Sequence, residues 1–216
     1  DRYVTIVDHN STYKTLQDLA GTTVATRFGT GAEAVLRKHY TQSGLRWEDF
    51  TYVNLRIEDM TAALQRGQIE AFTAWEPTGA IAVANGAGRI LRFYGDVSRV
   101  PASIHTTRSF AYRNEDMLVR FLAAHVLKAR LIADDPAGAA AIAARAAGAT
   151  GSEVPAAAFE SVFRRVDFSA GIDGDVIRSI EDTAEFLLEQ GKIDRVPELS
   201  WDASFLERAI ELADSL

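Results

Sequence analysis

The sequence of 216 residues contains no cysteine and no long hydrophobic run. Without cysteine, this stretch of chain has no disulfide, no thiolate metal ligand and no cysteine nucleophile. The missing thiols also fit a protein of an oxidising compartment outside the cytoplasm. No apolar segment approaches the roughly 20 residues that cross a bilayer, so we expect no transmembrane helix. No signal peptide is visible at Asp1, and we expect that a leader has been removed or that the sequence begins inside a longer protein.

An excess of basic residues is also lacking. The chain has 23 Lys and Arg against 30 Asp and Glu, for a net charge of −7. Residues 1–100 are balanced at 11 of each sign, whereas residues 101–216 have 12 basic and 19 acidic residues. Neither half has a basic face, which argues against nucleic acid as a partner. We interpret the acidic half as solvated helix faces; a docking surface for a cationic partner is the alternative.

Motifs of metal binding and catalysis are missing as well. The sequence has no Gly-x-Ser-x-Gly elbow, P-loop or Gly-x-Gly-x-x-Gly fingerprint. The histidines are far apart and lack metal-ligand spacing: His9, His39, His105 and His125. We therefore predict no metal, no cofactor and a role in binding instead of catalysis.

What the sequence does contain is an alternation of strands and helices between residues 22 and 93. Such alternation is typical of βαβ units and predicts an α/β fold with a parallel-rich sheet. A short β-type run at residues 3–7 precedes it. The predicted strands are 22–26, 50–55, 69–74 and 89–93, and the predicted helices are 32–43, 60–66 and 77–85.

The second half is different. We expect an extended connector at residues 100–107 that leads into a strand, and helices nearly throughout from Asn114 onward. One of these, at 137–149, is rich in alanine. So many amphipathic helices need a sheet to pack on, and the chain offers few strands here. We expect the missing strands upstream of Asp1.

The predicted ligand site lies where parallel strands end. Ligands of open α/β sheets bind beyond the carboxyl ends of the strands. The turn after the first of these strands contains Gly29, Thr30 and Gly31 and opens directly into a helix, whose backbone N–H groups favour an anion. The alternative is that this turn is only a helix cap. The residues at the three strand ends are Arg27, Phe28, Asn54, Trp75 and Glu76.

Each of these side chains suits a role. Arg27 is a candidate clamp for a sulfonate, carboxylate or nitrate, or else a surface arginine paired with a local acid. Trp75 offers a flat apolar face, or else belongs to the core. Asn54 is a candidate amide contact, and Glu76 is either a ligand contact or a complement to a helix dipole.

The order of several motifs resembles the periplasmic substrate-binding proteins of ABC importers for nitrate, taurine and alkanesulfonates, with the thiamine-pyrimidine-precursor binders. The resemblance covers nearly the whole chain in order. Its motifs are Leu16-Gln17-Asp18-Leu19-Ala20-Gly21, Gly29-Thr30, Ala63-Leu64-Gln65-Arg66-Gly67, Trp75-Glu76-Pro77 and Phe186-Leu187-Leu188-Glu189-Gln190-Gly191.

The resemblance implies a two-lobed fold. Residues 1–14 would end the first lobe, residues 15–98 would form the second lobe, and residues 99–216 would return to the first. It also implies that Thr30, Gly31 and Ala32 contact the ligand. The function implied is capture of a small organic anion by hinge closure, in a monomer outside the cytoplasm that delivers to an ABC permease of the inner membrane.

One residue departs from the family pattern. Glu33 stands where the family often has histidine or an aromatic residue, and a carboxylate is unfavourable beside a simple anion such as nitrate. Glu33 therefore favours a larger organic or zwitterionic ligand, unless it caps the helix.

Two other functions stay open. One is an enzyme on the same fold, of desulfinase or pyrimidine-synthase type, for which these residues supply no cysteine. The other is the effector-sensing domain of a transcription regulator.

Overall fold

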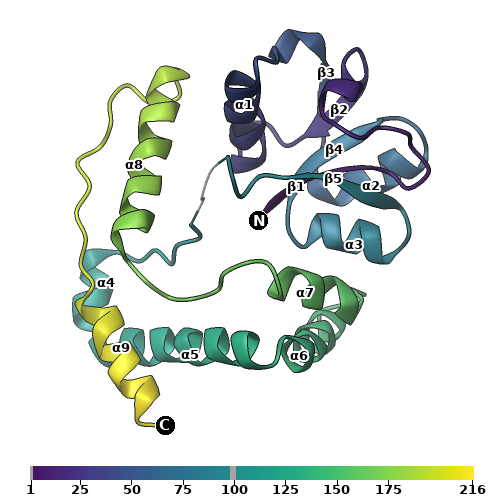
Figure 1. The fold of residues 1–216 in the computed structure, drawn as a ribbon. Helices are drawn as coiled ribbons and strands as arrows, with labels where there is room; N and C mark the ends of the chain where they lie inside the picture. The colour runs from purple at the N-terminus through teal and green to yellow at the C-terminus, as the bar shows by residue number, and fades with distance from the viewer. Residues whose placement is uncertain (1, 98–100) are drawn as a thin grey trace. The chain divides into compact units, whose positions relative to one another are not determined.

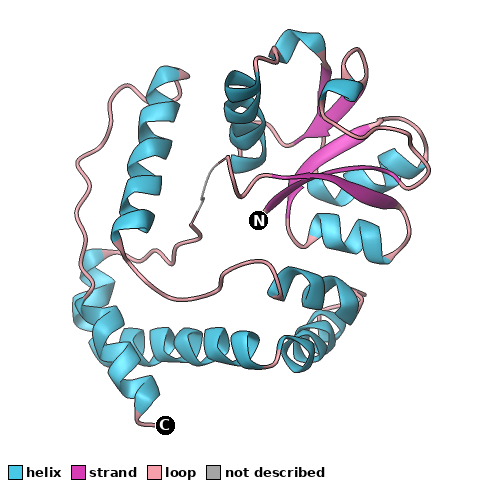
Figure 2. Cartoon of the chain, viewed as in Figure 1, coloured by secondary structure: helices cyan, strands magenta, loops and turns pink. Residues whose placement is uncertain are grey.

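A computed structural model describes residues 2–97 and 101–216, which form two compact units (Figure 1). Unit 1 combines the N-terminal part of the chain, up to residue 97, with residues 136–166. Unit 2 contains residues 101–135 and 167–216. Within the described residues all strands belong to unit 1, whereas unit 2 contains helices and loops (Figure 2).

A mixed sheet of five strands lies at the centre of unit 1, in the order β3-β2-β4-β1-β5. The strands are β1 (Tyr3–Asp8), β2 (Thr23–Thr26), β3 (Thr51–Asn54), β4 (Ala71–Trp75) and β5 (Gly88–Phe93). β2 pairs in parallel with β3 and β4, and β1 lies antiparallel between β4 and β5. The four predicted strands therefore run in one direction, which confirms the α/β fold with a parallel-rich sheet. The insertion of β1 among them was not predicted.

Helices cover both faces of this sheet. α1 (Gly31–Ser43) lies on one face, and α2 (Ile57–Gln65) and α3 (Thr78–Ala84) lie on the other (Figure 1). Successive strand residues alternate between the faces, so Val4 and Ile6 of β1 enter the apolar core beneath α2 and α3. Tyr3 and Thr5 point to the α1 face. This face is more polar, and it includes the end of the sheet where the ligand site was predicted.

Two further helices belong to unit 1, α6 (Pro136–Ala149) and α7 (Ala156–Phe163). They pack on each other, and α7 also packs on α3. The compact units thus divide the chain differently from the expected segments 1–14, 15–98 and 99–216, because β1 and residues 136–166 both belong to unit 1. The expected boundary at 98/99 lies outside the described residues, and the assignment of segments to lobes stays a proposal.

Unit 2 contains α4 (Arg108–Arg113), α5 (Glu115–Asp134), α8 (Gly174–Glu189) and α9 (Ser204–Asp214). The expected strand after the connector is wrong. Residues 101–107 have no regular structure and lead into α4, whose first turn is capped by the Thr107 hydroxyl accepting the Phe110 N–H. Val100 lies outside the described residues. No helix in the described part of the chain is long and apolar enough to cross a membrane.

Candidate functional site

The register of the sheet brings three predicted segments to one edge. Thr26 of β2 pairs with Asn54 of β3 and with Thr73 of β4, so these strands end beside one another. The residues that follow Thr26 therefore lie next to Asn54 and Trp75. This edge is the one at which parallel strands present ligands.

Asn54 holds the turn that follows β2. Its side-chain oxygen accepts hydrogen bonds from the Phe28 N–H at 3.2 Å and from Nη1 of Arg27 at 3.3 Å. The chain reverses at Gly29, whose φ of +73° lies in the left-handed region that favours glycine. Asn54, predicted as an amide contact for the ligand, thus has an observed structural partner, and Arg27 and Phe28 remain exposed at the edge.

The next residues form the N-terminus of α1. Thr30 is the N-cap in an extended conformation, but its hydroxyl donates to the Arg27 carbonyl at 2.6 Å instead of capping the helix. The first helical hydrogen bond runs from the Ala34 N–H to the Thr30 carbonyl. The N–H groups of Gly31, Ala32 and Glu33 precede it and have no carbonyl acceptor within the helix. This turn can therefore donate several hydrogen bonds to an anion, in a favourable helix dipole.

Glu33 is buried beneath the turn and has two partners of its own. One carboxylate oxygen accepts the Gly29 N–H at 2.7 Å, and the other pairs with Nε of Arg37 at 2.8 Å. The Arg37 guanidinium in turn lies 3.8 Å from the centroid of the Trp47 ring. The negative charge of Glu33 is therefore compensated locally. Its carboxylate braces the turn before α1 and does not cap the helix, whose start has no side-chain cap.

Trp75 is partly exposed at the end of β4, where it pairs directly with Tyr3 of β1. Cross-strand partners project to the same face, so both rings lie on the α1 face. Tyr3 was not among the site residues predicted from the sequence. A strand pattern does not show which end of the sheet the first residue of the strand reaches. The alternation of Tyr3, Thr5 and Val7 was the available signal for the face.

Glu76 points away from this edge into the packing of unit 1. Its side chain is 2% exposed, and it forms an ion pair with Arg165, which follows α7. The other carboxylate oxygen accepts the Ala80 N–H at 2.9 Å, in the first turn of α3. These contacts match the helix-dipole alternative that the sequence left open for this residue.

Below the site, polar side chains form a buried network. The Thr5 hydroxyl hydrogen-bonds with those of Thr73 and Tyr94, each at 2.6 Å, and Thr26 donates to the Thr73 carbonyl at 3.1 Å. Burial raises the pKa of Tyr94 above its ordinary value, so the phenol stays protonated. These groups satisfy one another within unit 1.

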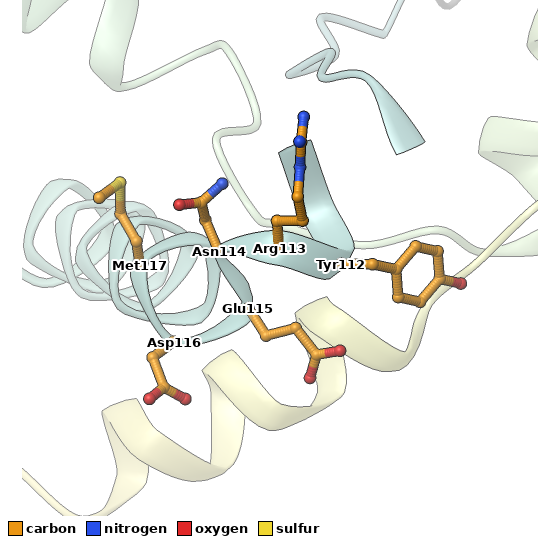
Figure 3. Close-up of a pocket in the computed structure, with 6 residues that line it drawn as sticks. All are labelled: Tyr112, Arg113, Asn114, Glu115, Asp116 and Met117. Carbon is orange, nitrogen blue, oxygen red and sulfur yellow. The ribbon is translucent and has the colours of Figure 1, made fainter. Parts of the chain in front are cut away.

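A different hollow lies in unit 2, at the junction of α4 and α5 (Figure 3). Its volume is about 270 Å³, and it is lined by consecutive residues: Tyr112, Arg113, Asn114, Glu115, Asp116 and Met117. It contains none of the predicted ligand residues. Among the described residues no cluster of His, Asp and Glu could hold a metal ion.

Comparison with known proteins adds independent information. The sequence matches the model of the NMT1-like family over residues 6–147. It is 31% identical over 111 residues to a protein of Escherichia coli (strain K12) that is named for aliphatic sulfonate binding, covering 51% of this chain and 35% of that protein.

Solved structures share the fold. The structural match to the periplasmic aliphatic sulphonate binding protein SsuA of Escherichia coli covers 96% of this chain and 64% of the SsuA chain, at 22% identity and a TM-score of 0.74. The alkanesulfonate-binding protein SsuA of Xanthomonas axonopodis pv. citri, bound to MOPS, has the same identity and TM-score and matches 91% of this chain and 66% of its own. The desulfurization enzyme DSZB also shares the fold, at 16% identity and a TM-score of 0.67, over 98% of this chain and 76% of its own. The chain thus spans less than two thirds of the length of these binding proteins.

Proposed function

We propose that this chain, which belongs to the NMT1-like family, is a solute-binding component of an ABC importer. Its ligand would be a small organic sulfonate. The resemblance to sulfonate-type binding proteins predicted from the sequence is confirmed. The ligand, the closure of two lobes around it, the permease partner, the location outside the cytoplasm and the monomeric state are parts of the proposal.

One observation supports a binding site in this chain more than any other. The first N–H groups of α1 are left without a side-chain cap, because the Thr30 hydroxyl bonds to Arg27 instead. An uncapped helix start beside an exposed arginine, at the carboxyl ends of parallel strands, is suited to a singly charged oxyanion.

The apolar surroundings favour an organic ligand over an inorganic anion. Phe28 is 41% exposed beside this turn, and Trp75 is partly exposed across from it. Aromatic side chains of this kind bind an aliphatic chain or ring by apolar contact. Relatives of the chain are named for aliphatic sulfonates, and one solved structure contains MOPS, a zwitterionic sulfonate. A sulfonate with an alkyl or ring substituent therefore fits better than nitrate.

An enzyme is the second candidate, since a desulfurization enzyme has the same fold. The 216 residues contain no cysteine, so thiol chemistry has no nucleophile within them. Incubation of the purified protein with an aromatic sulfinate, followed by assay for sulfite, separates the candidates: we expect no sulfite above the buffer control, and sulfite release would favour the enzyme.

A thermal-shift screen tests the proposal directly. The panel comprises ethanesulfonate, taurine, MOPS, nitrate, benzoate and a pyrimidine, with neutral ethyl methyl sulfone as the uncharged control. A ligand at about 1,000 times its Kd stabilises the native state by roughly 4 kcal/mol. We expect clear shifts for sulfonates and none for the sulfone; shifts for benzoate or the pyrimidine alone would reassign the ligand, and no shift at all would contradict the proposed function.

A further inference from the structure

Tyr3 lies at the centre of the candidate site, although no motif marks it. It opens β1 and pairs with Trp75, and its ring reaches the first residue of α1. The guanidinium carbon of Arg2 lies 5.5 Å from the centroid of the same ring. Tyr3 thus connects the aromatic side of the site with the helix N-terminus.

Close contact with Tyr3 explains the glycine at position 31. A Cβ atom on Gly31 would lie 2.1 Å from the Tyr3 hydroxyl oxygen and 2.7 Å from the carbon that carries it. The backbone of Gly31 is not in the left-handed region, so its conformation alone does not require glycine. The missing side chain instead allows the phenol to lie against the uncapped start of α1.

The Tyr3 hydroxyl lacks a partner in the part of the chain that the structure describes, although the residue is only 6% exposed. Other buried tyrosines are paired: Tyr94 with Thr5 at 2.6 Å, and Tyr40 with Tyr52 at 2.5 Å. The Tyr3 oxygen is not among the fully buried side-chain atoms that lack a partner in the described residues, so it keeps access to the surface beside the start of α1. A ligand at the α1 N-terminus would supply the missing acceptor.

We propose that Tyr3 is a ligand-binding residue, whose hydroxyl donates a hydrogen bond to an oxyanion held by the first N–H groups of α1. This inference rests on the proposed function and identifies one more donor of the same site. The ligand oxygen would sit between the phenol and the Gly31 and Ala32 N–H groups, with its organic substituent toward Trp75. Burial raises the pKa of Tyr3, which keeps the hydroxyl protonated as a donor at neutral pH.

The charges around this position suit an anion. Arg27 and Arg2 are the cations on either side, at the edge of the sheet. Among the described residues, the carboxylates of Glu33 and Glu76 are already paired, Glu33 with Arg37 and Glu76 with Arg165. The unpaired charge that the described residues place near the hydroxyl is therefore positive, which attracts an oxyanion.

The test compares two substitutions that each remove one hydroxyl. Tyr3→Phe removes the unpartnered group, and the matched control Tyr94→Phe removes a group that hydrogen-bonds with Thr5. Binding of ethanesulfonate is measured by isothermal titration calorimetry on the full chain, and the thermal unfolding midpoint is measured without ligand. A hydrogen bond to a charged group corresponds to roughly a 10- to 100-fold change in Kd.

We expect Tyr3→Phe to raise the Kd about 10- to 100-fold at an unchanged or higher unfolding midpoint, and Tyr94→Phe to lower the midpoint with an unchanged Kd. A Tyr3→Phe protein with the wild-type Kd would overturn the inference while the proposed function stands. A fall of its ligand-free midpoint like that of Tyr94→Phe would also overturn it, since the hydroxyl would then be structural. If wild-type protein binds no sulfonate, the proposed function fails first.

Discussion

Two side chains at the edge of the sheet would contribute different interactions to the proposed site. Arg27 presents a guanidinium held beside Asn54, and Trp75 presents an apolar face next to Tyr3. One is suited to the charged head of a sulfonate and the other to its substituent. Their contributions can be separated because neither belongs to the fully buried core.

We predict that Arg27→Ala and Trp75→Ala each weaken sulfonate binding without unfolding the protein. Loss of a charge-assisted contact is worth about 1.5–3 kcal/mol, so Kd should rise roughly 10- to 100-fold for Arg27→Ala. The Trp75→Ala effect should be larger for MOPS than for ethanesulfonate, because MOPS has the larger apolar substituent. Titration calorimetry measures both. Arg46→Ala is the control, since Arg46 is a surface arginine paired with Asp49; wild-type Kd values in both site variants would show that the pocket is misplaced.

His39 provides a prediction about pH. Its ring contacts that of Tyr94 edge-on, and its pKa is lowered from the ordinary value by burial and by the Arg92 charge, with a smaller opposing effect of Asp96. The unfolded chain therefore takes up a proton on this group at higher pH than the folded chain does. His39 thus stabilises the fold above a pH of about 6.5, and this contribution decreases as the pH falls toward the lower pKa of the folded state.

Urea unfolding at pH 7.5, 6.5 and 5.5 tests this expectation. Wild-type protein should lose more unfolding free energy over this range than His39→Gln, which has no titrating group at the position. Parallel pH profiles for the two proteins would mean that burial of His39 does not affect its titration.

The positions of individual residues in the fold could be predicted from the sequence better than the partners of their side chains. Gly29 and Gly31 marked the turn correctly, and Arg27 and Trp75 reached the expected edge. Asn54 and Glu76 also lie at strand ends, yet their side chains bind the protein itself. The sequence pattern predicts at which end of a strand a residue lies. The direction of its side chain depends on distant neighbours, such as Arg165 for Glu76, 89 residues away in the sequence.

Among the elements, α3 and α7 pack on each other and are also linked by the ion pair of Glu76 and Arg165. Glu76 is buried between them, where it accepts the Ala80 N–H and pairs with Arg165, and the Arg165 guanidinium also lies 4.7 Å from the Phe93 ring centroid. A buried charge that loses its partner is strongly destabilising.

We predict that Arg165→Met lowers the unfolding free energy by about 3–5 kcal/mol, because Glu76 is left buried and unpaired. The double variant Glu76→Gln with Arg165→Met should recover part of the loss, since no buried charge then remains. Chemical denaturation measures both. If the double variant is as unstable as the sum of the single changes, the pair is not coupled and the structural role assigned to Glu76 is wrong.

The strands and helices of unit 1 were largely predictable, whereas their order in the sheet was not. Alternation of β and α segments implies parallel strands, and this prediction is confirmed for β2, β3 and β4. A period of two residues carries no information on direction or neighbour, so the antiparallel place of β1 could not be derived. The helix α4 was taken for a strand because its cap, Thr107, follows an extended segment.

Across the whole molecule, the two units differ in their secondary structure. Unit 1 has a sheet covered on both faces, while the described part of unit 2 contains helices only. Unit 2 also exposes several large apolar side chains: Phe110, Tyr112, Met117, Phe121, Leu127 and Leu131. That these helices pack on strands of a first lobe stays a prediction, consistent with a chain that spans 64% of the SsuA structure.

Titration of the full chain with ethanesulfonate tests the central claim most directly. The account predicts saturable heats that fit one site per chain, and no saturable heat with ethyl methyl sulfone, which has a similar shape and no charge. Saturable binding should weaken in Arg27→Ala. If ethanesulfonate, taurine and MOPS all give no saturable heat with correctly folded protein, sulfonate capture at the α1 N-terminus is contradicted.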